Sequence, residues 1–451
     1  MVNWFRSTLR GLSKKPDLRA TLFNFQWLML ERAVALGSAL FVMIPVARYL
    51  GPGEFGVLTF TTAIAALAAP LSTLGLNHVV TKELKDHPDR TGATLGTVAF
   101  LRKAGAMLAF VLVGLWLFVQ PPSDPRIKIY VALVMGANLV ASVSFLQFWA
   151  LAEGKIDRYS RSQIINTAAF SAIRLGMVFT GRSLTAFVVL AALEIVGQGV
   201  LTYTFYRGAK EGKVIAWSFD AALAKKLLSR SWPLLFSGLA AAVYLKLDLV
   251  MLGQLSSTAE VGIYSAAARL SELWYFVPEM LMTALFPYLL KAKKSDPEIY
   301  NRRLQQMYDC LCALGCLVAL TITVLSSFIV TTLFGKDYAA AAPMLSIHVW
   351  AGVFVFMRSL LSKWIIAEDL YVFSLVTHGI GATINVVLNL YLIPRYGGIG
   401  ASIATLISYS CASYFSLLAH PKTRVTFFMM TKALLWPRRL PALMSHIRTS
   451  F

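Results

Sequence analysis

The side chains in this sequence best suited to chemistry are charged residues that lie within long apolar stretches. Eight basic and five acidic residues occupy such positions. A charge inside a membrane costs several kcal/mol unless it is paired or hydrated, so these side chains are expected to face an interior cavity. Arginine keeps its charge when buried and holds phosphate through two parallel donors. We therefore predict a cationic cavity for an anionic, phosphate-bearing substrate, lined by Arg32, Arg174, Lys246, Arg269 and Arg358.

A second set of polar and acidic side chains accompanies these cations at helical spacing. Residues three, four or seven positions apart share one face of a helix. The asparagines predicted to line the same cavity are Asn24, Asn166, Asn385 and Asn389. The groups predicted to balance its charges are Glu31, Asp248, Glu272 and His378. The alternative is that some of these charges form structural salt bridges, as the spacing of Arg269 and Glu272 allows.

The elements that must position these residues are membrane-spanning helices. The chain is 57% hydrophobic and only 14% charged, whereas an average soluble domain is about a quarter charged. A helix needs roughly 20 apolar residues to cross a membrane. The sequence predicts twelve such spans, at residues 21–49, 56–78, 94–119, 127–151, 162–180, 183–206, 232–254, 261–290, 310–334, 343–367, 370–393 and 397–418.

The placement of the remaining basic residues predicts the orientation of these spans. Segments on the side of the amino terminus hold twenty-eight lysines and arginines, whereas segments on the other side hold six. Cytoplasmic loops are enriched in such residues, so both termini are expected in the cytoplasm. This distribution explains the net charge of +20 without a nucleic-acid partner. Three of the four cysteines share one helical stretch and no second pair completes a metal set, so neither a metal nor a cofactor is predicted.

A weak internal repeat predicts two halves. Glu54-Phe-Gly56 follows the first span and Glu260-Val-Gly262 follows the seventh, and a proline comes later in each half. Such repeats are typical of transporters whose halves are related by an axis along the membrane normal. The predicted fold is an all-α membrane protein with twelve transmembrane helices in two six-helix bundles, related by a pseudo-two-fold axis. The predicted parts are an amphipathic cytoplasmic N-terminus (1–20), two bundles (21–206 and 232–418), a cytoplasmic linker (207–231) and a basic cytoplasmic tail (419–451).

Several of these segments resemble one family of transporters. The turn at residues 48–56, the stretch 233–253 around Asp248, and the stretch 260–269 are similar to bacterial polysaccharide and O-antigen flippases. Residues 385–401, with their two asparagines, continue the similarity, which covers nearly the whole chain to about Leu418. These flippases form the polysaccharide transporter family of the multidrug/oligosaccharidyl-lipid/polysaccharide exporter superfamily.

The resemblance implies a function and a set of partners. The expected activity is translocation of an undecaprenyl-diphosphate-linked oligosaccharide across the cytoplasmic (inner) membrane by alternating access. The expected partners are this lipid-linked oligosaccharide, membrane lipids and polysaccharide polymerase machinery. The family pattern places Arg32 and Arg269 in the cationic cavity. Proton or sodium coupling is common in the superfamily, and its candidates here are Glu31, Asp248, Glu272 and His378.

Two other classes of membrane protein remain as alternatives. An ion-coupled multidrug exporter of the same superfamily would carry cationic substrates, which bind best in an acidic cavity. The predicted spans hold eight basic and five acidic residues, and this balance disfavours such an exporter. A membrane enzyme such as an oligosaccharide polymerase or ligase would need catalytic groups on the outer face. The predicted outer loops are short, contain no histidine, and hold as acids Glu54, Asp124, Glu260 and Asp337. We therefore expect a transporter rather than an enzyme.

Overall fold

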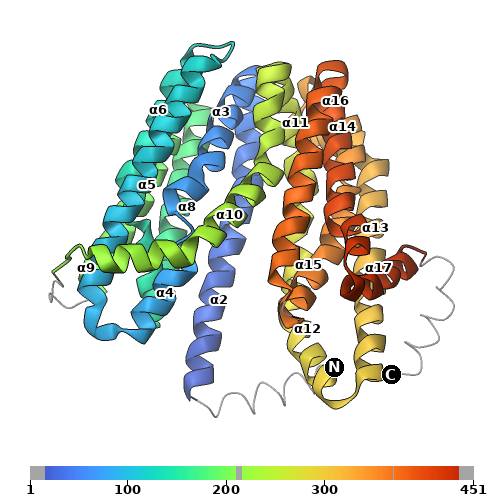
Figure 1. The fold of residues 1–451 in the computed structure, drawn as a ribbon. Helices are drawn as coiled ribbons and strands as arrows, with labels where there is room; N and C mark the ends of the chain where they lie inside the picture. The colour runs from blue at the N-terminus through green and yellow to red at the C-terminus, as the bar shows by residue number, and fades with distance from the viewer. Residues whose placement is uncertain (1–15, 210–215, 369, 436–451) are drawn as a thin grey trace. The chain divides into compact units, whose positions relative to one another are not determined.

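The structure, a computed structural model, describes residues 16–209, 216–368 and 370–435. Within these ranges every regular element is a helix (Figure 1). Most of the predicted N-terminal segment and the end of the predicted tail lie outside the described residues. The described chain divides into two compact units, one up to Tyr49 and from Thr61 to Leu239, the other at Leu50–Phe60 and from Ala240 onward.

The first unit is built from long apolar helices and short connecting ones. Its elements are α2 (Pro16–Gly37), a π-helical turn (Ser38–Val42), α3 (Met43–Thr73, outside Leu50–Phe60), α4 (Asn77–Asp86), α5 (Thr91–Val119), α6 (Arg126–Val140), α7 (Leu146–Ala152), α8 (Ile156–Phe179), α9 (Leu184–Ala209) and the start of α10. Trp149 is fully buried in its core and meets the ring of Tyr206 edge-on, at 4.8 Å between centroids.

The second unit contains the remaining helices and the short segment of α3. Its elements are the end of α10 (Ala221–Leu255), α11 (Thr258–Glu272), α12 (Phe276–Ser295), α13 (Pro297–Phe334), α14 (Ala341–His348), α15 (Ala351–Ala367), α16 (Tyr371–Ser413) and α17 (Pro421–Leu434). The side chain of Ser257 caps α11 by accepting from the backbone N–H of Glu260. Tyr244 and Tyr409 stack at 4.2 Å in a core cluster. Local capping and aromatic packing thus fix helix ends and helix contacts in this unit.

The two repeated glycine turns pack against each other within the second unit. A Cβ added to Gly56 would lie 1.7 Å from the carbonyl oxygen of Thr258, and one added to Gly262 would lie 2.0 Å from that of Pro52. Only glycine permits this backbone approach. The repeat that the sequence suggested is therefore a structural contact, and it accounts for the inclusion of Leu50–Phe60 in this unit.

Two glycines break long helices where the sequence predicts boundaries between spans. Gly51 (φ 70°) interrupts α3, and Gly397 (φ 53°) interrupts α16. A positive φ is strained for any residue with a Cβ. The Glu260 carboxylate accepts a hydrogen bond from the backbone N–H of Gly398 at 2.8 Å, and so caps the helix that follows the second break.

Eight helical stretches of the described chain are long and apolar enough to cross a membrane. They are Gln26–Thr73, Pro88–Val119, Arg126–Ala152, Leu184–Gly208, Ala221–Leu255, Pro297–Phe334, Ala341–Ala367 and Val372–Ala419. The prediction of a multi-pass, all-helical membrane protein is thereby confirmed, whereas twelve spans in two bundles remain a prediction. The predicted spans at 162–180 and 261–290, which carry several charges, are not among the eight.

Part of the predicted linker at 207–231 is helical in the structure. It becomes helical at Ala221, because α10 runs without interruption from there to Leu255. The Lys226 ammonium lies 2.6 Å from the buried Glu83 carboxylate of α4, within the first unit. The second half of this polar segment is therefore a docked helix.

Candidate substrate and ion-coupling sites

A buried carboxylate, Asp248 of α10, is the most completely coordinated of the predicted groups. Its Oδ2 atom accepts hydrogen bonds from the hydroxyls of Tyr264 (3.0 Å) and Thr405 (2.6 Å). Its Oδ1 atom accepts one from the Asn389 amide at 2.6 Å. Asp248 is only 5% exposed, and among the described residues no basic side chain lies within ion-pair distance of it. Three neutral donors thus hold a carboxylate whose charge has no cationic side chain to balance it.

The surroundings of Asp248 are rich in oxygen atoms. The Asn389 amide also donates to Asn385 Oδ1 at 3.0 Å, while Asn389 Oδ1 is buried without a hydrogen-bond partner. Sodium and other hard cations prefer carboxylate, amide and hydroxyl oxygens. Among the described residues, no three His, Cys, Asp or Glu side chains lie close enough together to hold a metal ion. A cation at Asp248 would therefore be held largely by neutral oxygens. Asp248, Asn385, Asn389 and Thr405, called here the Asp248 cluster, can bind a proton or a small cation.

A buried cation lies elsewhere in the same unit. Arg358 of α15 is 8% exposed and donates to the Ala412 carbonyl (2.7 Å) and to the Thr377 hydroxyl (3.0 Å). It also lies 2.9 Å from His378 Nε2. Because arginine remains protonated, His378 must accept this bond and carry its own proton on Nδ1. Both predicted residues therefore meet, with His378 in its neutral form.

Two further predicted groups of the second unit form an ion pair. The Lys246 ammonium lies 3.7 Å from the Glu272 carboxylate. Arg269, which is spaced to pair with Glu272 along α11, has its guanidinium 5.7 Å from the centroid of the Phe55 ring. Arg269 is half-buried. The structure thus joins Lys246 with Glu272, a pair that spacing along one helix does not reveal.

The predicted groups of the first unit lie on α2 and α8, and one of their partners lies on α9. Arg174 pairs with Glu194 at 2.5 Å, and the Asn166 amide donates to the backbone carbonyl of Glu194. Glu31 accepts a hydrogen bond from the Ser160 hydroxyl at 2.7 Å. Its neighbour Arg32 is exposed. Asn24 lies in α2, and its side chain lies outside the described residues.

The sequence reasoning identified the charged centres and missed several of their partners. Tyr264, Thr405, Thr377, Ser160 and Glu194 hold the predicted groups without having been singled out as site residues. A signal for one of them exists. Buried hydroxyl residues recur every third position along α16, at Ser402, Thr405 and Ser408.

Comparison with known proteins places the chain in a polysaccharide biosynthesis family with relatives named as flippases and transporters. The model of a family described as polysaccharide biosynthesis protein matches residues 22–293, more than half of the chain. A protein of Haloferax volcanii called probable flippase AglR is 25% identical over 396 residues, which cover 84% of this chain and 79% of that protein. A putative O-antigen transporter of Shigella flexneri is 25% identical over 307 residues, covering 65% and 72%.

Solved structures share the fold at low sequence identity. The lipid II flippase MurJ in an inward closed conformation has a TM-score of 0.68 at 13% identity, covering 96% of this chain and 93% of that one. An inward-facing multidrug resistance transporter of the MATE family has a TM-score of 0.59 at 14% identity, covering 94% and 99%. The fold is that of an all-helical membrane transporter, and the resemblance drawn from the sequence is confirmed.

Proposed function

The chain belongs to the polysaccharide biosynthesis protein family, and from this premise we propose that it flips an undecaprenyl-diphosphate-linked oligosaccharide across the bacterial cytoplasmic membrane. Its relatives are named as a flippase and as an O-antigen transporter, so the chain is a transporter rather than an enzyme. The cargo in this proposal is one polysaccharide repeat unit on its lipid carrier. Two six-helix bundles with both termini cytoplasmic open alternately to either face.

The exposure of Arg32 within an apolar stretch carries the proposal. Arg32 lies in the membrane-compatible segment Gln26–Thr73, and its side chain is exposed. A guanidinium at membrane depth needs water or an anion beside it. Trp27 precedes Arg32 by five residues in the same helix. The Arg161 guanidinium lies over the Trp27 ring, 4.4 Å from its centroid. Cationic and aromatic groups together suit a diphosphate that carries sugars.

The other predicted cations contribute in different ways. Arg269, half-buried against Phe55, is the second proposed contact for the diphosphate. Arg174 and Lys246 each have a glutamate partner, so their charges are balanced locally. Arg358 donates its hydrogen bonds to Ala412 and Thr377 within the second unit. We assign the first contact with substrate to Arg32 and, on the strength of the family resemblance, to Arg269.

The Asp248 cluster is the proposed coupling site. A buried ionised carboxylate is costly, so a bound proton or sodium ion stabilises the packing of α10, α11 and α16 around it. The ligands that we propose for a cation are the Asp248 carboxylate and Asn389 Oδ1, and the fact that this amide oxygen is buried without a hydrogen-bond partner supports the fit. Such an ion supplies positive charge only. Its release leaves the carboxylate uncompensated and favours the alternative packing of these helices.

The proposed function is tested with purified protein in liposomes. A fluorescent undecaprenyl-diphosphate oligosaccharide is placed in one leaflet, and its appearance in the other is followed with a membrane-impermeant quencher. Protein-dependent flipping that an unlabelled lipid-linked oligosaccharide inhibits is the expected result. Flipping no faster than in protein-free liposomes would overturn the proposal.

A multidrug exporter is the second candidate function. The observation in its favour is the shared fold with the MATE transporter, which extends over 94% of this chain. It predicts that the same liposomes accumulate or release a cationic dye when an ion gradient is imposed. Dye transport without lipid flipping would replace the first proposal with this one.

A further inference from the structure

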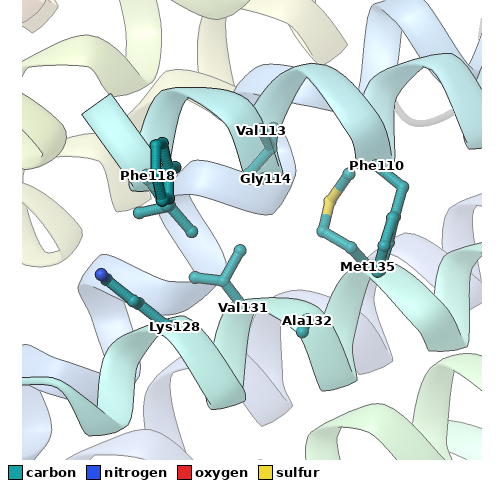
Figure 2. A pocket seen from close by; sticks show the side chains of 9 residues that line it. Phe110, Val113, Gly114, Phe118, Lys128, Val131, Ala132 and Met135 are labelled. Atoms are coloured by element: carbon teal, nitrogen blue, oxygen red, sulfur yellow. The ribbon is translucent and has the colours of Figure 1, made fainter. Parts of the chain in front are cut away.

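An apolar groove lies between α5 and α6 in the first unit. It holds about 200 Å³ and is lined at its core by Phe110, Gly114, Phe118, Lys128, Val131 and Met135. Figure 2 shows Lys128 and Phe118 at one end of the groove, and Phe110 with Met135 at the other. Drug-sized ligands occupy about 300–1,000 Å³, so this groove suits a narrower occupant such as a section of an acyl chain.

The groove opens on a surface that lipid can reach. Phe118 is 81% exposed and its neighbour Val119 is 71% exposed. Both lie at the end of α5, in a helical stretch that is long and apolar enough to cross a membrane. From Lys128 to Met135 the helix rises by about 10 Å, at about 1.5 Å per residue. The lysine lies two residues inside α6, next to the loop that joins it to α5. The groove therefore runs from the edge of the membrane into its apolar part.

The charges at the loop end fit one negative charge. The Arg126 guanidinium is paired with Asp124 at 2.8 Å. Lys128 is exposed, and among the described residues no carboxylate lies within ion-pair distance of it. One available ammonium matches the single charge of a phosphodiester, whereas the diphosphate of the proposed cargo carries more charge than it can balance.

We propose that this groove binds an anionic phospholipid, with its phosphate at Lys128 and one acyl chain along Gly114 and Val131. This proposal does not rest on the proposed function. A Cβ added to Gly114 would enter open space, with no other atom within 4 Å. Because Gly114 lines the groove, a larger side chain at this position is expected to fill it.

The site is tested by photo-crosslinking in liposomes of phosphatidylcholine that contain a diazirine-labelled phosphatidylglycerol. Labelled peptides are located by mass spectrometry, and the exposed apolar face of α13 at Leu320, Val324 and Phe328 serves as the internal reference. Wild-type protein is expected to label residues 110–118 and 128–135 more strongly with phosphatidylglycerol than with a phosphatidylcholine probe. Lys128→Gln is expected to reduce that preference about fivefold, while Lys128→Arg keeps it.

A filling variant separates the groove from general lipid contact. Gly114→Leu is expected to abolish labelling of both segments with either probe, and to leave labelling of α13 unchanged. Gly136→Leu is the matched control, because a Cβ there also meets nothing within 4 Å and Gly136 does not line the groove. Equal labelling by both probes, or labelling unaffected by Gly114→Leu, would overturn the proposal. Displacement of the probe by a lipid-linked oligosaccharide would also overturn it, in favour of the cargo's own tail.

Discussion

At the scale of single residues, the account depends on how each buried charge is balanced. Asp248 is held by neutral donors, whereas Arg174 and Lys246 face glutamates. A buried charge that is paired with an opposite charge contributes mainly to stability. A buried charge that has only neutral neighbours can instead be balanced by a bound ion. Asp248 is therefore expected to respond to ions, and the paired cations are expected to respond to the loss of their partners.

Replacing Asp248 tests the coupling site. Asp248→Asn keeps the shape of the side chain and removes its charge, so the folded protein is expected to form while flipping loses its dependence on sodium or pH. The measurement is the flipping rate in liposomes with and without an imposed ion gradient. Asp337→Asn, at an exposed acid beyond α13, is the matched control and should retain the dependence. An ion response that persists in Asp248→Asn would refute the assignment.

The Arg174–Glu194 pair tests the structural alternative for a predicted substrate contact. Arg174→Ala leaves the carboxylate of Glu194 without its partner, and we expect a loss of about 3 kcal/mol in the free energy of unfolding. The double variant Arg174→Ala/Glu194→Ala should recover most of that loss and keep flipping, because no charge remains unbalanced. Unfolding in a mild detergent gives the stability cycle. Stable double-variant protein that does not flip would return Arg174 to the substrate path.

How far the site could be predicted is also decided at this scale. Charges and polar groups inside apolar runs are visible in one sequence, and so Asp248, Arg358 and His378 could be proposed as candidates. Their partners come from other helices, as Thr405 and Thr377 do, and the spacing along one helix does not reveal which helices meet. The pairing of Lys246 with Glu272 illustrates the same limit, because it joins α10 to α11.

At the scale of elements, glycine decides where helices end and where they touch. The predicted boundaries at 49–56 and 393–397 agree with the breaks at Gly51 and Gly397, because apolar runs and positive-φ glycines mark the same places. The helical start of α10 was not predicted. Its polar sequence is typical of a linker, and it is held as a helix by tertiary contacts such as Lys226 with Glu83.

The packing of the two repeated turns gives a prediction at this scale. Gly262→Ala places a Cβ 2.0 Å from the Pro52 carbonyl oxygen, so the turn must shift and the melting temperature is expected to fall by several degrees. Gly53→Ala in the facing turn is the control, because its Cβ meets nothing within 4 Å. Thermal unfolding of both purified variants provides the measurement. Equal melting temperatures for the two variants would show that the turns do not pack this closely.

At the scale of the whole molecule, the fold and the family agree on a membrane transporter. The likeness to MurJ covers nearly the entire chain, and the family match covers more than half of it. A shared fold also hosts drug exporters, so the fold alone does not choose the cargo. The choice depends on the cationic groups that the membrane-spanning helices present.

The most direct test of this account compares flipping by wild-type protein, Arg32→Ala and Arg395→Ala in the same liposome assay. Arg395 is exposed, lies over the Tyr391 ring and is not one of the proposed site residues, so its variant controls for loss of one positive charge. The account predicts that Arg32→Ala lowers the flipping rate of the diphosphate-linked oligosaccharide at least tenfold, at unchanged melting temperature, while Arg395→Ala flips at the wild-type rate. Wild-type flipping by well-folded Arg32→Ala would contradict it.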